Sequence, residues 1–232
     1  MKIVAGYLWY ILIIAGAILS LYLTACQKDA SNDDPDIYGK WVDPADGTVY
    51  RTLELGDQIW MADNINRGEM IAGNREQEDN GVIEKYCYDN NPVLCEKYGG
   101  LYQWEEAMQY STTESSQGIC PEGWHIPSDS EWKILEIFLG MPADAAGEIL
   151  WRGSNQGRMI QPGGETGFDA LRGGNRFLTG SFNQLGSTGY FWTSTMAEGN
   201  HAWRRGVGLE EDGIYRSVNH KTFGFPVRCI KY

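Results

Sequence analysis

Residues 118–132, Gly118-Ile-Cys-Pro-Glu-Gly-Trp-His-Ile-Pro-Ser-Asp-Ser-Glu-Trp132, contain the strongest folding signal in the chain. Ser128 and Glu131 have the S-x-x-E spacing of a capping box, in which a hydroxyl and a carboxylate satisfy the free backbone N–H groups of a first helical turn. Asp129 adds negative charge at the positive end of the helix dipole. The sequence therefore predicts that a helix begins at Ser128.

The residues that follow give this helix an apolar face. Trp132, Leu135, Phe138 and Leu139 recur at three- and four-residue steps, which is the period of one side of an α-helix. Gly140 favours the end of the helix there. We therefore expect a helix over residues 128–139 whose tryptophan face packs in the core, because aromatic side chains contribute strongly to core packing.

The chain has 232 residues and is acidic, with a formal net charge of −12 at pH 7. Its first 25 residues hold one lysine and no acid, which leaves 18 basic and 31 acidic residues, a net charge of −13, in the remainder. A charge of this sign disfavours binding to nucleic acid or to anionic membrane surfaces. The 29 glycines and the short apolar runs indicate many tight turns, as in small β-rich folds.

The N-terminal segment has the layout of an export signal. Lys2 precedes an apolar run over residues 3–23, and Leu23-Thr-Ala-Cys26 follows. This tetrapeptide resembles the lipobox of bacterial lipoproteins, which implies that residues 1–25 are a signal peptide and that Cys26 is acylated and anchors the chain in a membrane. An uncleaved membrane anchor is the alternative, because about 21 apolar residues are long enough to span a bilayer. Both interpretations place the domain outside the cytoplasm.

Residues 26–45 are polar, acidic and interrupted by proline, so we expect a disordered tether. The acidic residues just after Cys26 resemble the surface-export signal of Bacteroidetes-type lipoproteins. That resemblance implies an outer-membrane lipoprotein that faces the cell exterior. A plain linker is the alternative, and it would leave a periplasmic orientation open.

Four cysteines follow the leader: Cys87, Cys95, Cys120 and Cys229. An even number in an exported domain indicates two disulfides, and three pairings are possible. We favour a local Cys87–Cys95 bond and a long-range Cys120–Cys229 bond. A zinc site is disfavoured, because the sequence has no C-x-x-C motif and its three histidines are scattered. We therefore expect no metal and no other cofactor.

The rest of the chain predicts short strands and loops. Residues 48–55 and 58–62 flank Gly56-Asp57 as a β-hairpin, and residues 104–110 form a short second helix. Residues 141–167 are glycine-rich and are expected to have little regular structure. The segments 190–195, 202–207, 214–218 and 223–230 are expected to be strands of a meander that ends at Cys229, with a turn at residues 219–222.

Several motifs, in this order, resemble the Fibrobacter succinogenes major paralogous domain: Trp60-Met-Ala-Asp-Asn64, Cys120-Pro-Glu-Gly-Trp-His-Ile-Pro-Ser128 and Trp192-Thr-Ser-Thr195, with further matches at residues 98–104 and 224–229. The resemblance covers residues 46–232. That family consists of exported, often lipidated proteins, mostly without an assigned activity, and is similar in turn to C-type-lectin-like and formylglycine-generating-enzyme-like folds. It implies an α+β fold with a twisted antiparallel sheet, two helices and long irregular loops, and it supports the Cys120–Cys229 disulfide.

No catalytic residue is recognisable. The sequence has no G-x-S-x-G, H-E-x-x-H, phosphate-binding or dinucleotide motif, and two disulfides would leave no thiolate. His125 lies beside Trp124 in an apolar context and is expected to be a buried, hydrogen-bonded structural residue. We therefore expect a non-catalytic module. The alternative is an extracellular enzyme on a lectin-like fold with a site built from distant residues.

Six residues near the polar turns of the C-terminal strands are the candidate ligand-binding residues: Trp192, Trp203, Arg204, Tyr215, Arg216 and His220. Aromatic and arginine side chains provide large contact areas at modest entropic cost. The alternative is that both tryptophans are core residues and that the arginines are solvated. The sequence thus predicts a cell-surface module for binding or adhesion, whose partner is a glycan or a protein.

Overall fold

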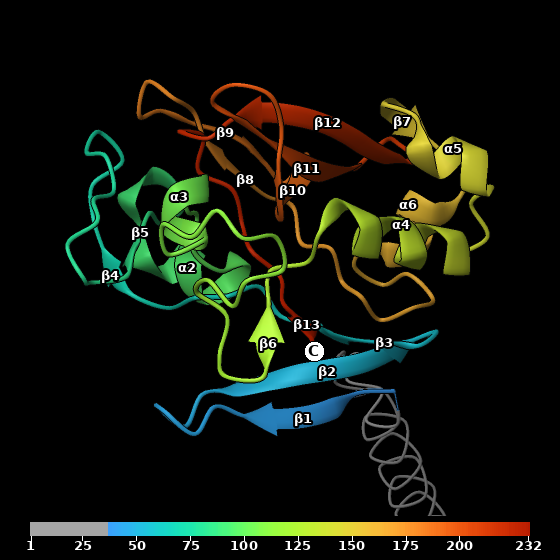
Figure 1. The fold of residues 1–232 in the computed structure, drawn as a ribbon, viewed down its shortest axis with the longest axis horizontal. Helices are drawn as coiled ribbons and strands as arrows, with labels where there is room; N and C mark the ends of the chain where they lie inside the picture. The colour runs from blue at the N-terminus through green and yellow to red at the C-terminus, as the bar shows by residue number, and fades with distance from the viewer. Residues whose placement is uncertain (1–36) are drawn as a thin grey trace, which may run out of the picture. The chain divides into compact units, whose positions relative to one another are not determined.

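Two antiparallel sheets form the frame of the computed structural model, which describes residues 37–232 (Figure 1). Helices and long loops connect the strands, so the fold is α+β, as expected. The expected signal peptide (residues 1–25), the lipidation site Cys26 and the first part of the expected tether lie outside the described residues. Within residues 37–232, no helix combines the length and the hydropathy that a membrane span requires.

The first sheet contains both the N-terminal and the C-terminal strand of the described chain. Its strand order is β1 (Gly39–Val42), β2 (Val49–Leu55), β3 (Gln58–Met61), β13 (Ile230–Lys231) and β6 (Trp124–His125). β2 and β3 form the predicted hairpin around Gly56, whose φ of +62° suits a residue without a side chain. Ile230 pairs with Trp60 on one side and with His125 on the other, so the last strand lies inside the sheet.

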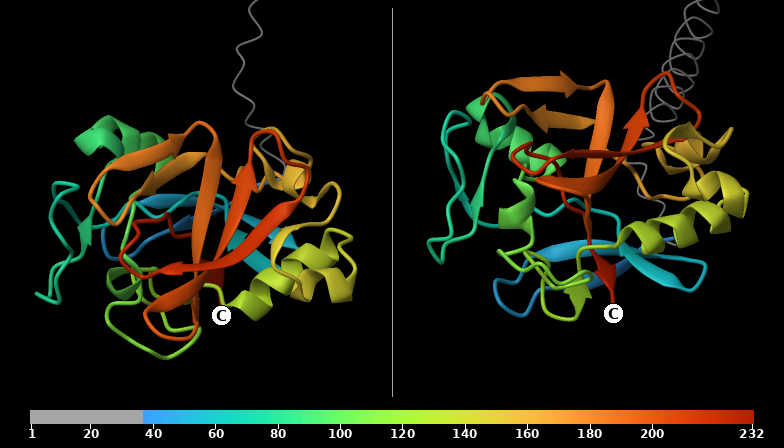
Figure 2. Two further views of the ribbon diagram at one scale, coloured as in Figure 1. Left: turned by 90° about the horizontal axis from the view of Figure 1, so that it is seen from above. Right: turned by 45° about the horizontal axis from the view of Figure 1, so that its top comes forward.

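The second sheet has the order β10 (Thr188–Met196), β11 (His201–Gly208), β12 (Ile214–His220) and β7 (Leu150–Arg152). It lies at the top of Figure 1, and the antiparallel hairpin of β8 (Gly173–Arg176) and β9 (Phe182–Leu185) lies beside β10 in Figures 1 and 2. The predicted strands at 190–195, 202–207 and 214–218 are therefore confirmed. A short parallel pair, β4 (Glu69–Met70) and β5 (Glu84–Lys85), completes the strands.

Helix α4 (Asp129–Phe138) begins as predicted. Ser128 Oγ accepts a hydrogen bond from the Glu131 N–H at 3.2 Å, and the Ser128 N–H donates to Glu131 Oε2 at 2.7 Å. Trp132 packs against Trp60 of the first sheet, with ring centroids 5.0 Å apart. The same core cluster includes Ile214 of the second sheet, so α4 packs on both sheets. Replacing a buried tryptophan of this kind by alanine typically costs about 3–5 kcal/mol.

Both favoured disulfides are present. Cys87 and Cys95 are 8 residues apart in sequence, and Cys120 and Cys229 are 109 residues apart. The second bond ties the residue before the last strand to the segment that leads into α4. By the chain-entropy argument, closing a loop of that length restricts the unfolded chain by roughly 4–5 kcal/mol.

The helix content differs from the expectation of two helices. The described residues contain five α-helices: α2 (Pro92–Tyr98), α3 (Trp104–Ala107), α4, α5 (Ala143–Gly147) and α6 (Gln156–Ile160). α3 is shorter than predicted. α5, β7 and α6 occupy the segment 141–167, which the sequence predicts to be irregular, because elements of five residues or fewer show no clear periodicity.

The C-terminal region also differs from the prediction. Of the segment 223–230, only Ile230 belongs to a strand, and Pro226 interrupts the earlier part because proline donates no backbone hydrogen bond. The expected turn at 219–222 begins as strand, since β12 continues to His220.

The folded part begins before residue 46. β1 lies within the expected tether and pairs with β2 along its whole length. The Tyr38 hydroxyl donates to the Gly167 carbonyl oxygen at 2.8 Å, which attaches this segment to a distant loop. β1 has little signal in the sequence, because it is only four residues long and is flanked by polar residues.

Candidate ligand-binding site

Adjacent residues of β11 and β12 point to opposite faces of the second sheet, because side chains alternate along a strand. One face, called here the helix face, carries Arg205, Ile214 and Arg216 and packs on α4. The opposite face, called the groove face, carries Arg204 and Tyr215. The six candidate residues therefore do not share one surface.

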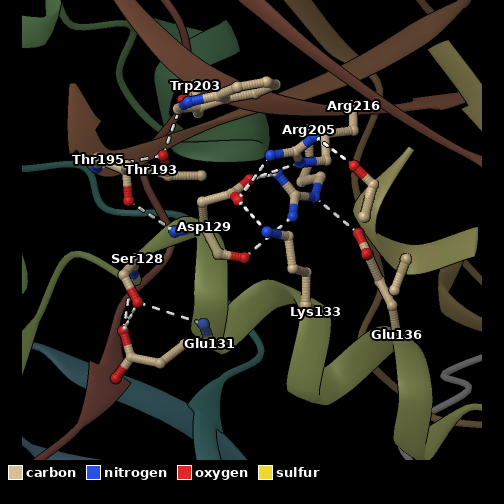
Figure 3. A network of polar contacts seen from close by, with 12 residues as sticks. Ser128, Asp129, Glu131, Lys133, Glu136, Thr193, Thr195, Trp203, Arg205 and Arg216 are labelled. Atoms are coloured by element: carbon tan, nitrogen blue, oxygen red, sulfur yellow. Dashed lines mark hydrogen bonds and ion pairs between the residues drawn. The ribbon is translucent and has the colours of Figure 1, made fainter. Parts of the chain in front are cut away.

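Arg205 and Arg216 belong to a buried ion-pair network on the helix face (Figure 3). Asp129 accepts hydrogen bonds from Arg205 Nη1 at 2.7 Å and from Arg216 Nε and Nη2, both at 2.8 Å. Glu136 accepts from Arg205 Nε at 2.6 Å and from Arg152 at 2.7 and 2.9 Å. All five side chains are buried. Arg216 is therefore a structural residue, contrary to its prediction as a ligand contact.

The network keeps Asp129 ionised. Burial by itself raises the pKa of Asp129, but the hydrogen bond from Arg216 and the charge of Arg205 outweigh this effect and hold the pKa well below its usual range. Lys133 contributes a further ion pair, with Nζ 2.7 Å from Asp129 Oδ2. The network thus joins α4 to β11 and β12, and removing one partner would leave buried charge without compensation.

Trp203 and His220 lie toward the far end of the helix face. The guanidinium carbon of Arg216 is 3.6 Å from the centre of the Trp203 ring, and Trp203 lines a separate, largely apolar hollow of about 420 Å³. The His220 ring lies edge-on to His201, with centroids 5.5 Å apart. These two candidates are therefore on the other side of the sheet from Arg204 and Tyr215.

Trp192 is a core residue. Its exposed fraction is 0%, its Nε1 donates to the Tyr102 carbonyl oxygen at 2.8 Å, and its ring centroid lies 4.5 Å from that of Phe225. The structure confirms the core interpretation for Trp192, which is not accessible to a ligand.

Arg204 and Tyr215 are the two candidates that the structure brings together. The guanidinium carbon of Arg204 lies 4.7 Å from the ring centre of Tyr215 and 4.8 Å from that of Tyr190, so the guanidinium is held between two aromatic rings. Trp151 meets Tyr215 edge-on, with centroids 5.0 Å apart. Tyr190, Arg204, Tyr215 and Trp151 come from β10, β11, β12 and β7, which is the order of the strands in the sheet. They form one row across the groove face.

Two hollows adjoin this row and share Tyr190. The smaller, of about 140 Å³, is lined by Trp151, Arg204 and Tyr215 among others. The larger, of about 580 Å³, lies between Tyr190 and the β8–β9 hairpin and has a size typical of small-ligand pockets. Its other lining residues are aromatic rings, hydroxyls and amides: Phe177, Phe223, Thr179, Ser181, Asn175, Asn183, Gln184 and Asn219. The row and both hollows are called the groove below.

The β8–β9 hairpin forms the outer wall of the groove. Gly174 has a φ of +67°, and a Cβ atom there would lie 2.4 Å from the Asn183 carbonyl oxygen, so glycine is required for the strands to approach. Asn175, which follows, is 5% exposed, and its Oδ1 has no hydrogen-bond partner among the described residues. A buried acceptor without a partner costs stability. Asn175 also lines the larger hollow, so its amide group is a candidate hydrogen-bonding partner of a ligand.

The groove is lined by positive charge and not by negative charge among residues 37–232, although the chain as a whole is acidic. Its lining within the described part of the chain contains no acidic residue and one cationic residue, Arg204. Burial lowers the pKa of Arg204, and the smaller electrostatic effects of Tyr190 and Tyr215 raise it. Arg204 nevertheless remains protonated at neutral pH, as arginines in proteins do. The described lining residues offer no carboxylate or imidazole for proton transfer. Its side chains therefore suit binding better than hydrolysis.

A larger hollow, of about 860 Å³, lies between β1, β2 and α4. It reaches Ile37, the first residue that the structure describes. Its lining contains four aromatic residues, Tyr38, Trp41, Trp124 and Phe138, but also two lysines and two glutamates, whose opposite charges can satisfy one another. The groove is therefore the better candidate site.

Comparison with known families identifies the domain. The family described as Fibrobacter succinogenes major domain matches residues 53–231, from β2 to β13. The chain belongs to this family. The match confirms the resemblance seen in the sequence motifs and includes every strand of the groove. No curated protein and no solved structure is significantly similar to the chain.

Of the groove residues of this Fibrobacter succinogenes major domain, Arg204 and Tyr215 were predicted from the sequence, whereas Tyr190, Trp151 and Asn175 were not. Tyr190 begins a strand that the sequence predicts. Side chains alternate between the two faces of a sheet along each strand, and in the register of β10 and β11 this alternation puts Tyr190 on the same face as Arg204. Trp151 and Asn175 lie in segments without a strand signal. No local pattern indicates that they meet the C-terminal strands.

The polar pair of His125 and Glu131 is structural. His125 is buried, and its Nε2 lies 2.8 Å from Glu131 Oε1, a carboxylate that also caps α4. This confirms the prediction of a hydrogen-bonded structural histidine. Within residues 37–232, no group of three or more His, Cys, Asp or Glu side chains is arranged to hold a metal ion.

Proposed function

We propose that this protein is an exported, lipid-anchored cell-surface module that binds a glycan in the groove. The supporting observation is the row of Tyr190, Arg204, Tyr215 and Trp151 beside a hollow lined with amides and hydroxyls. A sugar ring has apolar C–H faces and a rim of hydroxyl groups. Aromatic rings suit the faces, and amide and hydroxyl groups, which both donate and accept hydrogen bonds, suit the rim.

The fold we propose for this module is C-type-lectin-like. Three features support it: the first and last strands share a sheet, a disulfide joins Cys120 before the main helix to Cys229 before the last strand, and long loops separate the sheets. In this arrangement the groove is built by the C-terminal strands, by β7 and by the β8–β9 hairpin. Sequence-distant segments thus meet at one surface.

The decisive experiment for glycan binding compares two tryptophans on opposite faces. The full chain, solubilised in detergent, is screened on a glycan array together with Trp151→Ala and Trp203→Ala. We expect Trp151→Ala to weaken binding roughly tenfold or more, because a ring that stacks on a ligand acts as a binding hot spot. Trp203→Ala, on the helix face, should leave binding unchanged. Failure of the wild-type chain to bind any glycan, or loss of binding only in Trp203→Ala, would contradict the proposal.

The anchor at Cys26 and the orientation toward the cell exterior are tested separately. The two disulfides support an oxidising compartment, since such bonds persist outside the cytoplasm. We expect proteinase K to digest the protein on intact cells, and Cys26→Ser to release it from the membrane fraction. Protection in intact cells and digestion only after lysis would show a periplasmic protein instead.

A further inference from the structure

We propose that the saccharide in the groove carries a carboxylate, as a uronic acid does, and that Arg204 binds this carboxylate. This inference rests on the proposed glycan-binding function and names the class of glycan. Its starting point is an arginine that is half-buried in the groove with few partners of its own. Among the described residues, Arg204 donates one hydrogen bond, from Nε to Asn219 Oδ1 at 2.7 Å, and has no ion pair.

The other buried arginines show how this protein normally satisfies a guanidinium group. Arg205 and Arg152 share Glu136, and Arg205 also reaches Asp129. Arg228 has no acidic partner in the described chain, yet it donates to Asn64 Oδ1 and to the carbonyl oxygens of two further residues. The Nη1 and Nη2 atoms of Arg204 have no such acceptor among residues 37–232. Arg204 is therefore a guanidinium whose terminal N–H groups are left for a ligand.

The surroundings of Arg204 also set the orientation of these N–H groups. The rings of Tyr190 and Tyr215 hold the guanidinium between them. On the remaining side lies Gly206, where a Cβ atom would be only 2.8 Å from Arg204 Nη1. Any larger residue at this position would crowd the nitrogen. The planar guanidinium is thus preset, and its paired N–H groups match the two oxygens of a carboxylate.

The electrostatics of the groove favour an anion at this point. The chain has a net charge of −12, but no acidic residue of the described chain lines either hollow. Glu211 is the nearby acid, and it lies by Gly208 and Trp151 at the outer end of the row. Arg204 has lost part of its hydration between the two rings, and a poorly hydrated cation gains more from a facing anion than a fully hydrated one.

Asn175 provides a second, independent indication of a ligand. Its buried Oδ1 lacks a partner in the described part of the protein, and the residue lines the larger hollow. An amide side chain both accepts and donates hydrogen bonds, so it suits a sugar hydroxyl. The ligand therefore places its charge at Arg204 and a hydroxyl at Asn175, which is a combination that a uronic acid chain supplies.

The test compares acidic oligosaccharides with their neutral methyl esters, which keep the sugar rings and lose the charge. Oligogalacturonate and oligomannuronate, their methyl esters, and oligoglutamate as an acidic chain without sugar rings are titrated into the full chain in detergent by calorimetry. We expect an acidic oligosaccharide to bind roughly tenfold or more tightly than its ester, since a hydrogen-bonded ion pair of this kind is worth at least that factor. Oligoglutamate should bind weakly or not at all.

Three variants separate recognition of charge from other effects. Arg204→Met should reduce binding of the acid to the level of the ester and leave the ester unaffected, whereas Arg204→Lys should retain part of the preference. Lys40→Gln removes one exposed positive charge from the first sheet and should change neither. Equal wild-type binding of acid and ester, equal losses of both in Arg204→Met, or tight binding of oligoglutamate would overturn the inference. The proposed function survives the first of these results and fails if no saccharide binds at all.

Discussion

Arg204 and Arg205 are neighbours in the chain but have opposite environments, because they lie on opposite faces of the second sheet. Arg205 is 0% exposed and forms ion pairs with Asp129 at 2.7 Å and Glu136 at 2.6 Å. Arg204 has no ion pair in the described chain and lies between two tyrosine rings that border the groove. One arginine holds the fold together, and the other remains available to a ligand.

The contrast extends to the whole sheet. On the helix face, Arg205 and Arg216 meet carboxylates of α4, and this part of the face is buried. On the groove face, aromatic rings and amides surround hollows that contain no acid among the described lining residues. Because side chains alternate along each strand, a single sheet can separate stability from binding. Variants of the ion-pair network on the helix face should therefore change stability, and variants of the residues that line the groove should change binding.

The largest effect is expected for Glu136→Gln. This change keeps the shape of a 0% exposed side chain but removes the charge that two arginines, Arg152 and Arg205, share. We expect a loss of roughly 3–5 kcal/mol in the free energy of unfolding, as for other buried pairs with one partner removed. Urea denaturation measures it, with Glu54→Gln on the exposed side of β2 as the matched control. A loss no larger than that of the control would show that the network is not stabilising.

A smaller effect is expected from acid. The folded-state pKa of Asp129 lies below its usual value, so its contribution is complete above the unfolded-state pKa of about 3.9 and is lost as the pH falls through and below that value. For a salt-bridged aspartate the contribution is on the order of 2–3 kcal/mol. Urea midpoints measured from neutral pH downward should fall less steeply in Asp129→Asn than in the wild type. Parallel curves for the two proteins would contradict this role of Asp129.

The smallest effect on stability is expected for Arg204→Met. Methionine keeps the packing between the rings of Tyr190 and Tyr215. It removes a positive charge that is partly desolvated and that has no acidic partner in the described chain. The free energy of unfolding should change by about 1 kcal/mol or less, in either direction. Arg205→Met, measured in the same denaturation series, should be clearly destabilising. Similar losses for the two variants would end the distinction between the faces.

The sequence predicted those parts of the molecule that depend on local signals. The capping box of Ser128 and Glu131 defines the start of α4, and Gly56 marks the first hairpin, since each signal lies within a few residues. The disulfides were predicted because exported cysteines pair and because the family resemblance favoured one pairing. Arg204 and Tyr215 were found as an arginine and an aromatic residue on predicted strands.

The remaining features depend on contacts that no local pattern reveals. Arg216 looked like a surface arginine because its partner, Asp129, is 87 residues away in sequence. Trp203 and Arg204 were placed in one candidate site although neighbouring strand residues face opposite ways. Asn175 and Trp151 lie in short strands with little periodicity, and only the folded sheet brings them to the groove.

The division of the sheet into a structural face and a binding face is tested most directly by fluorine NMR of the full chain labelled with 5-fluorotryptophan. Trp151 is 40% exposed in the groove, Trp203 lies on the helix face and Trp192 is in the core, and single Trp→Phe variants assign their signals. Titration with the tightest-binding uronic oligosaccharide should shift the Trp151 signal saturably and leave those of Trp203 and Trp192 in place. A saturable shift of Trp203 with Trp151 unchanged would contradict the account.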